Sequence, residues 1–265
     1  MAAGTIRTAL VTGASAGIGA EFARELAARG AALILVARRK EKLDALSVEL
    51  HERHGVAIEV LPADLAEDED LELVERRIAM AETLDLLVNN AGFGSPGPFS
   101  KNEVERFLTM IQVHVAASVR LTRAALKGMT ARGRGDIINV ASIAAFSPLS
   151  GSVYSATKAF LVNFSENLQY ELARTGVRIQ ALCPGLTHTE FHEVSGADTS
   201  ALPGFLWMSA PDVARISLRA LGRRKVVCVP GLKNRLIIAP MRCAPTAALI
   251  RAIVNLPYFR RKAGV

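Results

Sequence analysis

Short apolar runs alternate with helical patterns over most of the chain. The run Ala31–Ala37 is apolar at every position, which is expected for a strand covered on both faces of a sheet. Strands separated by helices in this way run parallel and are joined by right-handed crossovers. We therefore predict an α/β fold in one domain, with a doubly wound parallel sheet of about seven strands and helices on both faces.

A glycine-rich loop follows the first apolar run, which ends at Val11. The loop reads Gly13-Ala-Ser-Ala-Gly17-Ile-Gly19 and leads directly into a helical pattern. Amide groups at a helix N-terminus attract phosphate, and glycines let the backbone approach it closely. The spacing departs from the GxGxxG dinucleotide fingerprint, with three residues between the first two glycines and one between the last two. By itself the loop indicates a phosphate-containing ligand without identifying it.

Tyr154 and Lys158 lie four residues apart in a stretch predicted to be helical from Ser152 to Arg174. This spacing stacks their side chains on one helix face, one turn apart. A free tyrosine titrates near pH 10, and moving its pKa to about 7 requires roughly 4 kcal/mol of preference for the phenolate, which a nearby cation in a partly dry site can supply. Such a phenol can take or give a proton at neutral pH.

Several other segments give local expectations. Asp64 is placed to cap a helix whose first turn is rich in acids, and Ser209 or Ala210 is placed to begin another. Residues 186–209 have no sustained period, and we interpret them as a lid over an apolar site. Residues 245–256 are predicted to form a small amphipathic helix.

Five motifs occur in a fixed order along residues 8–190. Each alone has a structural explanation, such as a core aromatic, a solvated lysine, a helix cap or a turn. The motifs are Thr12-Gly13-x-x-x-Gly17-x-Gly19, Asn89-Asn90-Ala91-Gly92, Ser142, Tyr154-x-x-x-Lys158 and Pro184-Gly185. Together they resemble the short-chain dehydrogenase/reductase family, and the resemblance fades in the last quarter of the chain.

The resemblance implies NAD(P)-dependent oxidation of an alcohol or reduction of a ketone by direct hydride transfer. It implies that Tyr154 donates the proton for ketone reduction, that Ser142 hydrogen-bonds the substrate oxygen, and that Lys158 lowers the Tyr154 pKa and binds the nicotinamide ribose. The residues implied to bind the dinucleotide are Gly13, Ser15, Gly17, Ile18 and Gly19 in the loop, Asp64 and Leu65 at the adenine, Asn90, Ala91 and Gly92 on the adenosine side, Tyr154 and Lys158, and Pro184, Gly185, Thr187 and Thr189 at the nicotinamide end.

The charge at the end of the second strand bears on the choice of cofactor. An acid there accepts the adenosine ribose hydroxyls and repels a 2′-phosphate, whereas an arginine attracts the phosphate. The segment reads Val36-Ala37-Arg38-Arg39-Lys40, with no acid before Glu41. We predict NADP(H) in preference to NAD(H), with Arg38 as the main contact.

His114 departs from the family pattern. It lies in one long helix predicted for residues 102–131, with a break near 101–107, at a position where the family usually has an asparagine that completes a proton relay to the lysine. An imidazole could also pass protons, because its pKa lies near neutrality. Alternatively His114 packs structurally while another group or water serves the relay. The sequence leaves both open, and we include His114 with Ser142, Tyr154 and Lys158 as candidate catalytic residues.

The basic character of the chain belongs to its tail. The net charge is +7, yet residues 205–265 hold twelve Lys or Arg against the single acid Asp212. A solvated face or a subunit contact explains such a segment, and docking on an acidic surface such as phospholipid headgroups or an acidic carrier is the alternative. We divide the chain into a Rossmann-type dinucleotide-binding and catalytic domain at 1–230 and a basic, partly helical C-terminal extension at 231–265, packed on that domain or on a partner.

The expected substrate is an apolar ketone or secondary alcohol, fatty-acyl or steroid-like, in a pocket lined by apolar side chains. The residues expected there are Phe93, Gly94, Pro96, Ile143, Ala144, Phe146, Pro148, Leu149, Phe191, Phe205, Leu206, Trp207 and Met208, while His188 and His192 are expected to face solvent.

We further expect a homo-oligomer formed through the long helices, no metal and no nucleic-acid partner. The three cysteines have no metal-site spacing and are expected to be buried thiols. No secretion signal or membrane span is visible, so the sequence predicts a cytoplasmic location, with the tail as a candidate membrane-surface contact. The competing interpretation is an NADP(H)-binding relative with weak or no catalysis that acts as a sensor or a membrane-peripheral interaction protein.

Overall fold

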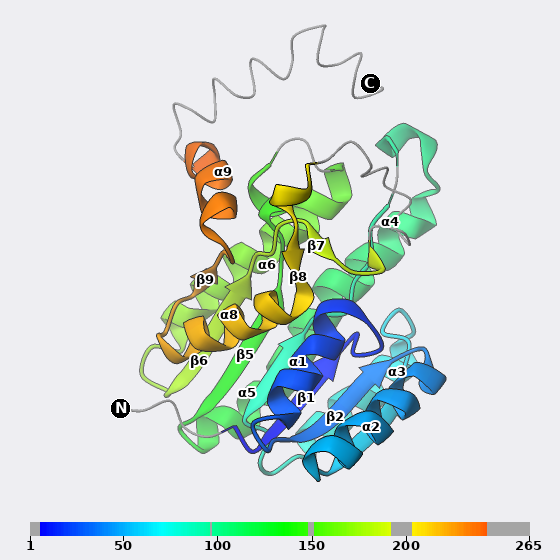
Figure 1. Cartoon of the computed structure of the whole chain (residues 1–265), viewed down its shortest axis with the longest axis vertical. Coiled ribbons are helices and arrows are strands. Elements are labelled where there is room, and N and C mark those ends of the chain that lie inside the picture. Colours follow the sequence, from blue (N-terminus) through cyan, green and yellow to red (C-terminus); the bar gives the residue numbers. More distant parts are fainter. Residues whose placement is uncertain (1–5, 96, 148–150, 192–202, 243–265) are drawn as a thin grey trace, which may run out of the picture.

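The computed structural model describes residues 6–95, 97–147, 151–191 and 203–242 (Figure 1). Their central element is a seven-stranded sheet in the order β3-β2-β1-β4-β5-β6-β9, with every neighbouring pair parallel. The predicted fold class is confirmed. The strands are β1 (Thr8–Thr12), β2 (Ala32–Ala37), β3 (Ile58–Pro62), β4 (Leu86–Asn89), β5 (Gly135–Val140), β6 (Val177–Leu182) and β9 (Val227–Cys228).

Helices cover both faces of this sheet because the strands are apolar on both sides. One face packs against α1 (Gly17–Ala27), α2 (Lys40–His54) and α8 (Ala210–Gly222), around the fully buried Phe22. The other packs against α3 (Asp68–Ala79), α5 (Ala117–Ala131) and α6 (Ser152–Glu171). Figure 1 shows α1, α2 and α8 lying together in front of the strands.

The helix predicted for residues 102–131 begins at Val104 and contains a π-helical turn that its sequence did not indicate. It consists of α4 (Val104–Ile111), a π-helical turn over Gln112–Ala116, and α5. The expected break near residues 101–107 is confirmed, because Asn102 and Glu103 are extended between a 3₁₀ turn at Phe99–Lys101 and the start of α4. Because π turns are rare and often mark functional positions, the location of this one around the buried His114 is informative.

Of the two predicted helix N-caps, Ser209 is confirmed and Asp64 is not. Ser209 caps α8, as expected, with its Oγ accepting a hydrogen bond from the Asp212 amide at 3.2 Å. Asp64 does not cap α3; the N-cap is Glu67, and Asp64 Oδ1 accepts instead from the Ala66 amide at 3.1 Å. The side chain of Asp64 therefore closes a tight turn before the helix begins.

The segment interpreted as a lid contains structure that its sequence did not indicate. β7 (Thr187–His188) pairs in parallel with β8 (Met208–Ser209) to form a second, two-stranded sheet. Short strands of two residues give no periodic signal, which is why sequence patterns missed them. Residues 192–202, including His192, lie outside the described residues.

Part of the C-terminal extension is also described. Helix α9 (Leu232–Arg242) contains Pro240 and packs through the buried side chains of Asn234 and Ile238. The helix predicted for residues 245–256 lies outside the described residues, as does Cys243, whereas the thiols of Cys183 and Cys228 are buried. Among the described helices, none is both long and apolar enough to cross a membrane.

Candidate active site

The sheet topology brings the sequence motifs to one edge. Strand order reverses between β1 and β4, so the carboxyl ends of the central strands open into a crevice, the usual ligand site of doubly wound sheets. The glycine loop follows β1, Asn90 follows β4, Ser142 follows β5 and Pro184 follows β6. Residues as far apart in the sequence as Gly13 and Pro184 therefore meet at this crevice.

The glycine loop has a shape that only glycines permit. Gly13 and Gly17 have φ angles of +65° and +57°, in the left-handed region. A Cβ on Gly19 would collide with the carbonyl oxygen of Gly13. Helix α1 begins after Ala16, which supplies no side-chain cap, so the first amides of α1 are left to a ligand. This cradle fits the pyrophosphate of a dinucleotide.

Hydrogen bonds brace the loop against the end of β4. The amide nitrogens of Asn90 and Ala91 donate to Thr12 Oγ1 at 2.9 and 3.0 Å, and Asn90 Nδ2 donates to the Thr12 carbonyl at 2.9 Å. The same Nδ2 lies 3.3 Å from the Gly13 carbonyl oxygen. Asn90 and Ala91 therefore fix the loop through Thr12, the first residue of the loop motif, which was not among the residues expected to bind the dinucleotide.

The Tyr154–Lys158 pair lies in the first turns of α6, next to Ser142. Ser142 caps the following 3₁₀ turn by accepting from the Ala144 amide at 3.1 Å, and it also hydrogen-bonds the Tyr154 hydroxyl. Lys158 is 4% exposed; its Nζ lies 5.7 Å from the centroid of the Tyr154 ring and donates to the Val140 carbonyl at 2.9 Å. The structure thus brings the three residues together.

The pKa values of this group differ from the expectation. Burial raises the pKa of Tyr154 to about 12, with the Ser142 hydrogen bond opposing the rise, and burial lowers the pKa of Lys158 to about 8. The expected depression of the Tyr154 pKa by Lys158 is not found in this arrangement, because burial dominates the Tyr154 pKa and the Lys158 ammonium donates to the Val140 carbonyl. At neutral pH Tyr154 is a protonated phenol and therefore a proton donor.

The two arginines after β2, Arg38 and Arg39, contact different residues. Arg38, the predicted phosphate contact, has a 72% exposed side chain and lies 3.4 Å from Asp64. Arg39 instead reaches the glycine loop, with Nε and Nη2 donating to Ser15 Oγ at 3.2 and 3.1 Å. Arg38 is the expected phosphate contact from the sequence because it directly follows the end of β2. Only the folded loop shows that the second one contacts Ser15.

The segment after β6 closes the other side of the crevice. Thr187 is buried and its Oγ1 donates to the Gly185 carbonyl at 3.0 Å. A Cβ on Gly17 would lie 3.1 Å from the Thr189 side chain, so Thr189 faces the glycine loop. Pro184 accepts a hydrogen bond from the Ile143 amide at 2.9 Å, which ties this segment to the turn after Ser142.

Comparison with known proteins decides the family. The family model described as short chain dehydrogenase matches residues 7–200. The chain belongs to the short-chain dehydrogenase family. The resemblance seen in its motifs is thereby confirmed, and the protein is an NAD(P)-dependent oxidoreductase of that family.

Named relatives and solved structures agree with this assignment. The very-long-chain 3-oxoacyl-CoA reductase of Anas platyrhynchos is 36% identical over 194 residues, covering 71% of this chain and 62% of the relative. A short-chain dehydrogenase from Sphingobium yanoikuyae in complex with NADPH is 35% identical with a TM-score of 0.83, covering 94% of this chain and 96% of that one. The bulky-bulky ketone specific alcohol dehydrogenase from Comamonas testosteroni is 34% identical with a TM-score of 0.79, covering 89% and 92%.

In this short-chain dehydrogenase, His114 replaces the usual asparagine and is 1% exposed. Its Nε2 accepts from the Phe93 amide at 3.0 Å, and its Nδ1 lies 2.9 Å from Thr157 Oγ1. That hydroxyl donates to the Tyr154 carbonyl at 2.8 Å, so it accepts from Nδ1–H. The contacts therefore assign the neutral Nδ1–H form of the imidazole. Burial, followed by the charge of Lys158, holds the pKa of His114 well below its usual value.

Two of the residues predicted to line a substrate pocket, Phe191 and Phe93, lie beside Tyr154 and His114. The Phe191 ring lies 5.8 Å from the Tyr154 ring, and Phe93 contacts His114 edge-on at 5.7 Å. Phe205, by contrast, is 63% exposed, and His188 is exposed as expected. Pro96, Pro148 and Leu149 lie outside the described residues. Within the described ranges, no group of His, Cys, Asp or Glu is arranged to hold a metal ion.

Proposed function

We propose that this short-chain dehydrogenase is an NADPH-dependent reductase of bulky apolar ketones, acting reversibly on the corresponding secondary alcohols. The observation that carries the proposal is the placement of Ser142, Tyr154 and Lys158 at the carboxyl end of β5, beside a glycine loop shaped for a dinucleotide. The substrate class is supported by the apolar surroundings of Tyr154 and by similarity to reductases of long-chain 3-oxoacyl and bulky ketone substrates.

The proposed mechanism assigns a separate task to each residue. Bound NADPH would supply the hydride to the carbonyl carbon. Ser142 and Tyr154 would both hydrogen-bond the carbonyl oxygen, and the protonated Tyr154 phenol would give that oxygen its proton. Lys158, whose Nζ lies 5.7 Å from the ring centroid, would then stabilise the phenolate left behind. The proton on Tyr154 is restored from solvent before the next turnover.

The same observations give a direct test of the proposed activity. Purified enzyme should consume NADPH in the presence of some member of a panel of aliphatic and cyclic ketones, and substitution of Tyr154 should abolish that consumption. NADPH that binds tightly without turnover on any ketone would instead favour a cofactor-binding protein without catalysis.

NADP(H) preference is proposed from the donors at the β2 end of the loop. Arg39 and Ser15 are hydrogen-bonded there, and Arg38 is exposed beside them. Two guanidinium groups and a hydroxyl match the donors that a 2′-phosphate requires. We therefore assign the main phosphate contact to Arg39, with Arg38 as a second cation.

His114 is proposed to position the active site rather than to carry protons. Both of its ring nitrogens are occupied: one holds the Phe93 amide after β4 and the other holds Thr157, whose hydroxyl is bonded to the Tyr154 carbonyl. The chain of bonds fixes the tyrosine turn of α6 to the loop next to the nicotinamide end. A neutral imidazole whose two ring nitrogens are both hydrogen-bonded to protein groups is poorly suited to transfer protons.

His114→Asn is expected to retain activity within about tenfold, because an amide can still accept from the Phe93 amide although it does not reach as far. The kcat pH profile should keep its shape in the variant. Thr157→Val, which removes only the acceptor of Nδ1–H, should lower kcat to a similar extent, with Thr157→Ser restoring it. Loss of a kinetic pKa near neutrality in His114→Asn would contradict this assignment and support a relay.

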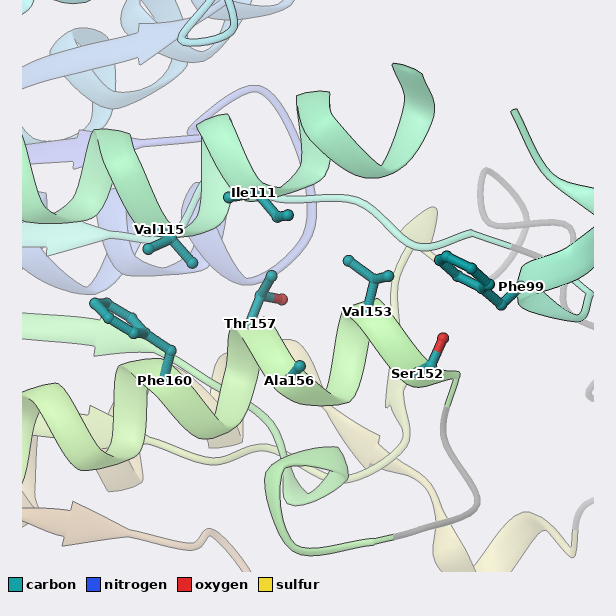
Figure 2. Close-up of a pocket in the computed structure, with 8 residues that line it drawn as sticks. All are labelled: Phe99, Ile111, Val115, Ser152, Val153, Ala156, Thr157 and Phe160. Atoms are coloured by element: carbon teal, nitrogen blue, oxygen red, sulfur yellow. The ribbon is translucent and has the colours of Figure 1, made fainter. Parts of the chain in front are cut away.

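A homo-oligomer is proposed through the outer faces of α4 and α6. A groove of about 580 Å³ between them is lined by apolar side chains from both helices, with Ile111 and Val115 pointing toward Val153 and Thr157 (Figure 2). Leu108 beside it is 59% exposed. Exposed apolar residues at 104, 108 and 111 form a stripe at helical spacing, which a second copy could cover.

Leu108→Asp should lower the mass measured by light scattering; an unchanged mass would contradict an interface here.

A second candidate function is favoured by α9. Its surface exposes Leu232 and Leu236 at 69% and 64%, together with Lys233 and Arg235. Aliphatic and basic side chains on one short helix suit the headgroup region of an anionic membrane. In this interpretation the protein acts at a membrane surface, with or without catalysis. Sedimentation with phosphatidylserine vesicles tests this second function. Binding of the protein to the vesicles at low salt would support it, and absence of binding at low salt would exclude it.

A further inference from the structure

Glu190 bridges two cations that lie far from it in the sequence. Its Oε2 accepts from Arg39 Nη1 at 2.9 Å and its Oε1 accepts from Lys42 Nζ at 2.5 Å. Glu190 comes two residues after β7, whereas Arg39 and Lys42 lie at the start of α2. The two cations hold the pKa of the Glu190 carboxyl below its usual value, so this side chain is ionised at neutral pH. The carboxylate thus ties the segment after β6 to the β2 end of the crevice.

Arg39 belongs to both this bridge and the glycine loop. While Nη1 holds Glu190, its Nε and Nη2 donate to Ser15 Oγ. The Arg39 guanidinium and the Lys42 ammonium hold the Glu190 carboxylate, and the Ser15 hydroxyl lies on the other side of the same guanidinium. These are donors that suit a phosphate group equally well. The carboxylate of Glu190 therefore occupies the cations that a phosphate at this end of the crevice needs.

We infer that Glu190 competes with the 2′-phosphate of NADP(H) for Arg39 and Lys42, and thereby sets how strongly the enzyme discriminates between dinucleotides with and without that phosphate. The inference rests on the proposed function in one respect, namely that the 2′-phosphate binds beside Ser15 and Arg39. A carboxylate and a phosphate repel each other, so both cannot keep the same two cations. A dinucleotide with a free 2′-hydroxyl has no anion at that position to compete for Arg39 and Lys42, so it leaves their ion pairs with Glu190 intact.

Release of Glu190 would also free the segment that carries it. Thr189, the preceding residue, contacts the glycine loop at Gly17, and His188 stacks on Trp207 with ring centroids 4.7 Å apart. Trp207 is the only tryptophan in the chain. Its emission therefore reports on this segment without a label.

Calorimetric titration with 2′,5′-ADP and with 5′-AMP tests the inference, because these probes differ only in the 2′-phosphate. Glu190→Gln should bind 2′,5′-ADP roughly five to ten times more tightly than the wild type does, because two exposed ion pairs no longer compete with the phosphate, and it should bind 5′-AMP as well as the wild type does. Asp44→Asn is the matched control, since it removes one exposed acid of α2 that pairs with Lys40. That control should change both affinities by less than about twofold.

Trp207 emission gives the second readout. It should change when the wild type binds 2′,5′-ADP but not when it binds 5′-AMP, and Glu190→Gln should show the changed emission before any nucleotide is added. Equal or weaker binding of 2′,5′-ADP by Glu190→Gln would overturn the inference while leaving NADP(H) preference intact. Equal affinity of the wild type for the two probes, unaffected by Arg39→Ala, would overturn the preference itself and the inference with it.

Discussion

Replacing Tyr154 by phenylalanine is expected to lower kcat for ketone reduction by about 10²- to 10⁴-fold. The substitution removes only the hydroxyl, which is hydrogen-bonded to Ser142 and has its pKa raised by burial to about 12. A phenol held in its protonated form can donate a proton to the carbonyl oxygen, and phenylalanine cannot. The affinity for NADPH should change little, because the glycine loop and the β2 cations are untouched.

Tyr170 provides a matched control for this experiment. It lies on the same helix, is 87% exposed and should tolerate phenylalanine without loss of activity. Turnover and NADPH affinity measured side by side in the two variants separate a chemical effect from a structural one. Tyr154→Phe with near wild-type turnover would remove Tyr154 from the mechanism.

Lys158→Met is expected to lower activity by about 10²-fold or more and at the same time to stabilise the protein. Burial lowers the pKa of Lys158 from 10.5 to about 8. A shift of that size corresponds to a cost of about 3 kcal/mol at neutral pH. The hydrogen bond from Nζ to the Val140 carbonyl is lost in the variant, at about 1 kcal/mol. The net gain in the free energy of unfolding should be about 2 kcal/mol.

The stability gain should depend on pH in a defined direction. Below pH 8 both the folded and the unfolded chain bind the Lys158 proton, so the cost of the buried ammonium is fully present. Between pH 8 and 10.5 the folded chain releases the proton while the unfolded chain keeps it, so wild-type stability rises relative to the variant. The advantage of Lys158→Met should therefore shrink across this window.

Denaturant unfolding of both proteins at pH 7 and at pH 10 measures this difference. Lys127→Met, at an exposed position of α5, is the control and should change stability little at either pH. A Lys158→Met protein that is less stable than the wild type at pH 7 would mean that the ammonium is solvated or paired in the folded enzyme.

The sequence predicted those features that depend on local pattern. Apolar runs alternating with helical patterns predicted the doubly wound parallel sheet, and in the structure Gly13, Asn90, Ser142 and Pro184 follow its strands at one edge. Parallel topology is sufficient for this, because motifs that follow parallel strands share an edge whatever their separation in the chain.

Features that depend on contacts between distant side chains could not be predicted. Nothing local distinguishes Arg39 from Arg38, and only the position of Ser15 in the folded loop makes the second arginine the loop contact. The direction of the Tyr154 pKa shift was also missed, because the i,i+4 spacing reveals the cation but not the burial of the phenol. His114 stood out as a departure from the family, but its neutral form follows from Phe93 and Thr157, which no motif connects to it.

Transfer of hydride between NADPH and a ketone is the central claim, and isotope transfer tests it most directly. NADPH deuterated at the reactive carbon of the nicotinamide should be incubated with a bulky apolar ketone, and the product alcohol analysed by mass spectrometry. We expect one deuterium on the former carbonyl carbon with the wild type and Tyr170→Phe, and formation of labelled alcohol slowed by about 10²-fold or more with Tyr154→Phe. Saturable NADPH binding without deuterium in any product, across the whole ketone panel, would contradict the account.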